Sequence, residues 1–157
     1  RDNVIGADFS GQIGGVGFRG EWLHNFADMG DDYDQLVLGG DYRISLELIV
    51  TAEYLYNTGA LSELELLDAL DRSSAGGVLT TSRHLAGGYF DYQFHPLLHF
   101  TGYLSVDPDK GGIFVGPRLS WNARQDLDIE FGAMLSNDRG EFSLASNSFF
   151  VNASWYF

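Results

Sequence analysis

The last ten residues of the chain, Ser148 to Phe157, read SFFVNASWYF and decide the expected fold. Every second residue counted back from the end is apolar, which gives the set Phe157, Trp155, Ala153, Val151 and Phe149. The residues between them are mixed and mostly polar. Because successive side chains of a β-strand lie on opposite faces, this segment predicts a strand with one apolar face and one mixed, mostly polar face.

The same ten residues resemble the C-terminal assembly signal of bacterial outer-membrane β-barrels. That signal ends on Phe or Trp and carries hydrophobic residues at alternate positions before it, as Phe149, Val151, Trp155 and Phe157 do here. The resemblance implies a bacterial outer-membrane location, with membrane lipid, lipopolysaccharide and the barrel-assembly machinery as partners. The glycine-rich segment 6–22 (GADFSGQIGGVGFRGEW) also resembles hairpins of Gram-negative porin-like proteins. A soluble β-sandwich could also end on an alternating strand, and it stays an alternative here.

Composition limits the class of protein. The 157 residues suit one domain, which we interpret as a β-barrel domain over residues 1–157 or the C-terminal part of one. The chain has no apolar run long enough for a membrane helix, but a membrane-spanning strand needs only about 9–11 alternating residues. The absence of cysteine excludes disulfides and thiolate chemistry, and no cofactor is expected. The net charge of −13 argues against a nucleic-acid partner.

Strand-like alternation recurs along almost the whole chain and predicts an all-β, antiparallel, up-and-down transmembrane β-barrel. About eight to ten strands are expected, and the alternation favours nine, at residues 5–10, 16–26, 35–44, 46–56, 86–94, 98–106, 113–121, 127–136 and 148–157. A single-chain bacterial barrel has an even number of strands. Nine strands therefore predict the C-terminal portion of a larger barrel, whereas eight, without the segment before Gly11, would allow this chain to close alone.

Residues 57–84 interrupt the alternation. The segment 61–70 (LSELELLDAL) has apolar residues at helical spacing, and Ser62 with Glu65 three residues later matches a helix N-terminal capping pattern. We expect a long loop that carries one short helix. It would lie either in the lumen, as a constriction or plug, or on the surface, against lipopolysaccharide or a partner.

One face of the predicted strands is nearly free of charge, with His24 as its only ionisable residue, and the other face is charged. In a membrane barrel the apolar face contacts lipid and the charged face lines the lumen, whereas a soluble barrel reverses this. Short connections alternate with long ones, and aromatic residues gather at strand ends, which favours the membrane barrel. The predicted pore-lining residues are Asp8, Arg19, Glu21, Asp41, Arg43, Glu47, Glu53, Asp91, Arg118, Asp128 and Glu130.

No catalytic or metal site is predicted. The four histidines are His24, His84, His95 and His99, and only the last two are four residues apart, across an expected turn. An outer-membrane lipid hydrolase needs a serine beside a histidine on the lipid face. On the predicted lipid face, His24 has no serine beside it, so we do not expect an enzyme.

The predicted lumen carries eight acids and three arginines, which favours a passive, porin-like channel for ions or small polar solutes, selecting by size and charge. We expect Arg19 to pair with Glu21, and Arg43 with Asp41. Three alternatives remain open: a wall whose acids satisfy one another around trapped water, a structural barrel that scaffolds or sheathes a partner, and a soluble lipocalin-like ligand-binding barrel. Remaining barrel strands or a plug protein are further candidate partners.

Overall fold

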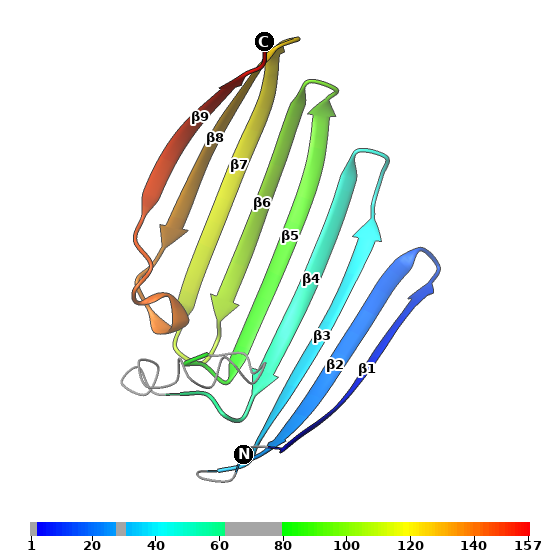
Figure 1. The fold of residues 1–157 in the computed structure, drawn as a ribbon, viewed down its shortest axis with the longest axis vertical. Helices are drawn as coiled ribbons and strands as arrows, with labels where there is room; N and C mark the ends of the chain where they lie inside the picture. The colour runs from blue at the N-terminus through cyan, green and yellow to red at the C-terminus, as the bar shows by residue number, and fades with distance from the viewer. Residues whose placement is uncertain (1–2, 28–30, 62–79) are drawn as a thin grey trace.

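The computed structural model describes residues 3–27, 31–61 and 80–157, and the strands of these residues form one nine-stranded sheet (Figure 1). Each strand pairs antiparallel with its neighbours in the chain, in the order β1 to β9. The strands are β1 Asn3–Ile13, β2 Val16–Phe26, β3 Tyr33–Arg43, β4 Leu48–Asn57, β5 His84–His95, β6 Leu98–Asp107, β7 Gly112–Arg124, β8 Leu127–Ser136 and β9 Ser148–Trp155. The predicted all-β, antiparallel, up-and-down fold is confirmed.

The strand bounds follow the alternation closely, and β2 and β8 match their predictions at both ends. The first hairpin differs, because β1 continues to Ile13 and Gly11 pairs with Phe18 instead of lying in a turn. The turn consists only of Gly14 and Gly15, with φ angles of 57° and 84°. Two-residue hairpin loops with positive φ at both positions match the right-handed twist of the strands they join, and glycine adopts them at no steric cost.

Connections of two kinds lie at opposite ends of the sheet. At the end where the C-terminus lies, residues 14–15, 44–47, 96–97 and 125–126 join consecutive strands (Figure 1). At the other end the joining segments are 27–32, 58–83, 108–111 and 137–147. We call these the turn end and the loop end. The predicted alternation of short and generally longer connections is therefore found in the strand bounds.

The sheet has almost no hydrophobic core. Among the described residues, Leu61 and Ala133 are the only buried hydrophobic residues. Large apolar side chains on the sheet are exposed instead, including Phe9 at 54%, Phe131 at 42% and Trp155 at 74%. A sheet in water buries an apolar face against a second layer, and the described part of this chain supplies none. The apolar face of the sheet is therefore not covered by any of the described residues.

The sheet has two edges, since β1 and β9 each pair with one neighbour only. All eleven residues of β1 are exposed. Inside the sheet, the β7–β8 pairing skips Gly116 and Pro117, between Val115–Leu135 and Arg118–Gly132. Proline has no N–H to donate, so its presence in a central strand accounts for this gap.

The predicted helix at 61–70 lies outside the described residues except for Leu61. Leu61 precedes the undescribed segment, and its backbone N–H donates to the carbonyl of Thr80 at 2.9 Å. The helix that the described residues do contain is η2, a single 3₁₀ turn at Gly140–Phe142 in the β8–β9 connection, which was not predicted. No helix of the described residues is long and apolar enough to cross a membrane.

Candidate functional site

The register of the sheet brings the predicted pore-lining residues onto one side, which we call the charged face. Ten of the eleven lie in strands, and opposite partners such as Asp8–Glu21 and Thr101–Arg118 place neighbouring strands in phase. Glu47 is the exception. It lies in the β3–β4 turn, where its carboxylate accepts a hydrogen bond from the Ser45 hydroxyl at 2.8 Å, so its predicted place on a strand is wrong.

Arg19 connects three strands across the charged face. Its guanidinium donates to Glu53 Oε2 at 3.1 Å and lies 3.7 Å from Asp41 Oδ1. Glu53 is two strands away, and Gly39 stands between the two residues in the register. A Cβ on Gly39 would come within 3.2 Å of the Arg19 guanidinium carbon, so the glycine leaves room for this crossing. All three charged side chains are about half exposed, which keeps each pair weak.

The two ion pairs predicted from sequence are not formed. Arg19 pairs with Asp41 and Glu53 instead of Glu21, and no ion pair among the described residues involves Arg43. Arg19 and Glu21 lie on one strand, two residues apart, with their side chains on the same side of the sheet. The carboxylates of Asp41 and Glu53, on the next two strands, come closer to Arg19. The alternation identified the face correctly and missed the partners, because these depend on the register.

Asp8 and Glu21 stand directly opposite each other on β1 and β2. Like charges in this position repel each other across a strand pair. No ion pair within the described residues neutralises either carboxylate. This hairpin therefore contributes uncompensated negative charge to the face, beside the Arg19 group, in which one guanidinium faces two carboxylates.

A second polar group lies at the turn end of β6 to β9. One row across the strands runs through His99, Ser120, Glu130 and Asn152, and the next row runs through Asn122, Asp128 and Ser154. Asn122 donates to Asp128 at 2.7 Å. His99 Nε2 lies 3.1 Å from Asp91, and Arg118 lies 3.5 Å from Glu130 and over the Phe150 ring, 5.8 Å from its centroid.

These two rows line an open pocket of about 350 Å³, which we call the turn-end pocket. Its polar lining includes His99, Ser120, Asn122, Asp128, Glu130, Asn152, Ser154 and Tyr156. Asp128 and Glu130 were predicted pore-lining residues. The amide and hydroxyl members were not identified, because the prediction counted only charges. Their signal in the sequence is a run of polar residues at alternate positions of the last three strands.

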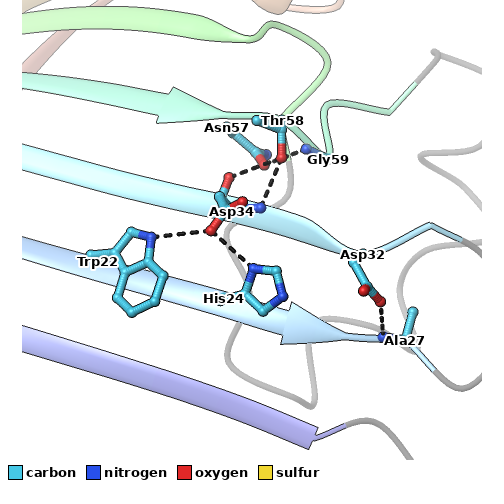
Figure 2. Close-up of polar contacts among 8 residues, drawn as sticks. All are labelled: Trp22, His24, Ala27, Asp32, Asp34, Asn57, Thr58 and Gly59. Atoms are coloured by element: carbon cyan, nitrogen blue, oxygen red, sulfur yellow. Dashed lines mark hydrogen bonds and ion pairs between the residues drawn. The ribbon is translucent and has the colours of Figure 1, made fainter.

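The apolar face carries polar groups at its loop end, shown in Figure 2. His24 Nδ1 lies 3.0 Å from Asp34 Oδ1, and the Trp22 indole N–H donates to the same oxygen at 3.1 Å. Asp34 faces His24 across β2 and β3, so the prediction that His24 is the only ionisable residue on this face is wrong. The His24 ring also packs edge-on against Phe26, with 4.4 Å between centroids.

A second histidine, His84, lies on the apolar face near the loop end, at the start of β5. The Tyr54 hydroxyl and His84 Nδ1 are 2.5 Å apart, and the Tyr56 ring lies 5.1 Å from the His84 ring. The register of β4 and β5 opposes His84 to Tyr56, on the apolar face. Rings with one apolar body and one polar tip are typical of membrane–water boundaries, where both parts are satisfied.

The loop end is held together by two carboxylates that the sequence did not single out. Asp107 is fully buried at the end of β6, where it accepts from the Ser82 hydroxyl and, at 2.9 Å, from the Glu141 amide. Glu141 in turn accepts from Thr81 at 2.6 Å (backbone) and 2.7 Å (hydroxyl). Three connections far apart in sequence therefore meet here, in what we call the carboxylate cluster.

The pKa of Asp107 reflects this environment among the loops. Burial raises the pKa, but hydrogen bonds to the charged form lower it by more, so it lies below the ordinary value of 3.8. The lowering contributions, from largest to smallest, come from the Ser82 hydroxyl and the backbone amides of Glu141, Lys110 and Asp109. The folded loop end therefore favours an ionised Asp107.

The four predicted assembly-signal residues lie at the edge of the sheet. Phe149 is 78% exposed, Val151 68% and Trp155 74%, all on the apolar face of β9. Phe157 follows the end of the strand and is exposed as well. Their role in assembly stays a prediction. Among the described residues, no group of three or more acidic or histidine side chains is placed to hold a metal ion.

The fold and this surface define a class: an up-and-down antiparallel sheet with one apolar and one charged face. No protein-family model and no curated protein matches the chain. Solved structures that resemble it include two porins. One is a KdgM porin in complex with disordered oligogalacturonate, at 10% identity and a TM-score of 0.49, covering 99% of this chain and 75% of the porin. The other is a NanC porin, at 16% identity and a TM-score of 0.48, covering 99% and 79%.

Because the sequence identities and TM-scores are this low, the function of this chain is inferred from its own residues.

Proposed function

We propose that this chain forms the wall of a channel in the bacterial outer membrane, which passes small cations and neutral polar solutes by size and charge. The observation that carries the proposal is the contrast between the two faces of a single sheet. The apolar face is exposed and has no protein layer over it among the described residues. The charged face carries acids in excess of arginines. Lipid outside and water inside satisfy both faces at once.

The charge balance sets the expected selectivity. Arg19 is shared by two carboxylates, and Arg118 faces Glu130, so most of the positive charge on the wall is already neutralised. Asp8 and Glu21 are not neutralised by any described cation. A water-filled lumen with net negative walls lowers the energy of cations inside it and raises that of anions.

The strand order suggests how the wall is placed. Short turns face the periplasm and long loops face outward in outer-membrane barrels, which would put the turn end inside and the carboxylate cluster outside. Because β1 and β9 each leave one edge unpaired, the lumen needs a closing contact at these edges. We propose that further barrel strands supply it. Lipid, lipopolysaccharide and the assembly machinery are the other partners that this placement implies.

The selectivity of the reconstituted protein tests this function. In a planar bilayer under a potassium chloride gradient, the reversal potential should show a preference for potassium. Changing Asp8→Asn together with Glu21→Gln should reduce that preference, because two uncompensated carboxylates are removed from the wall. Asp138→Asn, in the β8–β9 connection, is the matched control and should leave it unchanged. An anion preference in the unmodified protein, or full solubility without detergent, would contradict the proposal.

A further inference from the structure

We propose that the turn-end pocket is a binding subsite for a neutral polyhydroxylated solute of about monosaccharide size. The inference rests on the channel function proposed above and adds a place where a passing solute is held. The pocket lies on the charged face, over β6 to β9, and its volume of about 350 Å³ is at the lower end of the ~300–1,000 Å³ typical of small-molecule sites.

Three side chains on the pocket wall are available for a ligand. Ser120, Asn152 and Ser154 line the pocket, and none of them is hydrogen-bonded through its side chain to another described residue. Ser120 and Asn152 flank Glu130 in one row, and Ser154 ends the next row beside Asp128. Hydroxyl and amide groups that both donate and accept are therefore presented by two strands, β7 and β9, on either side of the carboxylates of β8.

The charged groups around the pocket are already engaged, which favours a neutral ligand. Glu130 faces Arg118, and His99 faces Asp91. Asp128 accepts from the Asn122 amide at 2.7 Å, which orients its carboxylate along the wall. Among the described residues, no arginine or lysine lines the pocket, so an anionic solute there would meet the two carboxylates Asp128 and Glu130. A hydroxyl group can donate to these carboxylates and accept from the neighbouring amides, with no net charge to compensate.

An aromatic ring borders the pocket at the end of the chain. Tyr156 is 60% exposed, and its backbone N–H donates to the carbonyl of Asp126 at 2.9 Å, which holds it beside the β7–β8 turn. A tyrosine presents an apolar ring and a polar hydroxyl together. A sugar ring has an apolar face and a hydroxyl rim, so this position can contact both parts of such a solute.

Conductance of the reconstituted protein, with the strands that close its barrel, tests the subsite with D-glucose as the probe. Glucose should reduce the potassium current saturably, whereas polyethylene glycol of similar size should reduce it only in proportion to concentration. Glucuronate, which adds a carboxylate, should bind more weakly. In the variant Asn152→Leu, the half-saturating glucose concentration should rise by about three- to tenfold, as expected for the loss of a hydrogen-bonding group. Ser105→Ala, on the charged face nearer the loop end, is the matched control and should leave it unchanged.

The outcomes separate the subsite from the channel. Conduction with a glucose effect that never saturates, or with equal effects in Asn152→Leu and the unmodified protein, overturns the subsite and leaves the channel intact. Absence of conduction by the protein together with the strands that close its barrel overturns the channel function. Calorimetric titration of glucose into the detergent-solubilised protein then decides the pocket on its own, because binding lost in Asn152→Leu supports it and no measurable binding refutes it.

Discussion

At the scale of single residues, the Asp107 carboxylate is the centre of the hydrogen bonds that join the loops. It is fully buried and accepts hydrogen bonds from one hydroxyl and three backbone amides. These four donors favour the ionised carboxylate. Removing the carboxylate would leave the buried donors without an acceptor, which would lower the free energy of unfolding by about 1–3 kcal/mol. The loop end therefore depends on the charge of one side chain.

A pH dependence follows from the lowered pKa of Asp107. Because its folded-state pKa lies below the ordinary 3.8, its contribution to stability is complete above that value and is lost as the pH falls through the folded-state pKa. The protection of the Lys110 and Glu141 amides from hydrogen exchange, relative to unfolded chain at the same pH, should fall over that acidic range, because both donate to Asp107. Asp107→Asn should show fast exchange at neutral pH already.

Asp138→Asn is the control for this measurement. Asp138 lies in the same connection as Glu141, has a φ of 55°, and asparagine adopts such a backbone readily. The control should keep the slow exchange of the unmodified protein at neutral pH. Equal exchange rates in Asp107→Asn and the control would show that the carboxylate does not hold the loop end together.

The contacts of Arg19 show which features of single residues were predictable from the sequence and which were not. Alternation alone placed Arg19, Asp41 and Glu53 correctly on one face, because strand periodicity is local. Their pairing depends on which residues stand opposite, and on the missing side chain at Gly39. A two-residue slip in register would keep every side chain on its face and change both, and the alternation of the sequence does not distinguish it. The same reason hid the carboxylate cluster, whose members come from three separate connections.

At the scale of elements, the first hairpin depends on its two-glycine turn. Gly14 has a φ of 57°, in the left-handed region, where a residue with a branched Cβ is strained by about 1–2 kcal/mol. Gly14→Val should lower the free energy of unfolding by about that amount, measured by urea titration in detergent micelles. Gly14→Asn should be nearly neutral, since asparagine tolerates this region. A loss as large in Gly14→Asn would mean that the turn is not left-handed at this position.

Strand bounds were predictable where polar and apolar residues alternate without interruption, as in β2 and β8. The first turn was predicted too wide because glycine has no side chain to show on which face it lies. Gly11, which the predicted strand bounds left between two strands, pairs with Phe18 inside the hairpin. The predicted helix at 61–70 is not tested, since it falls almost entirely outside the described residues. The 3₁₀ turn η2 was missed because three residues carry no periodic pattern.

At the scale of the whole molecule, the apolar face and the exposed end of β9 predict assembly into a membrane. Deleting Phe157 should lower the fraction of protein that reaches the folded, membrane-inserted state, because it removes the last apolar residue of the predicted signal. The heat-induced shift in gel mobility of protein extracted from outer membranes measures that fraction. Ser148→Ala, at the opposite end of β9, is the control and should assemble normally. Unchanged assembly after the deletion would contradict the assigned signal.

The strictly sequential strand order has a consequence for how such a wall can change over evolutionary time. Each strand pairs only with its neighbours in the chain, so a hairpin duplicated or lost beside β1 alters the circumference without disturbing the pairing of the other strands. The turn-end pocket lies on β6 to β9, at the far side of the sheet from that edge. Pore width and solute recognition can therefore diverge independently, one through the number of hairpins and the other through point substitutions in the last four strands.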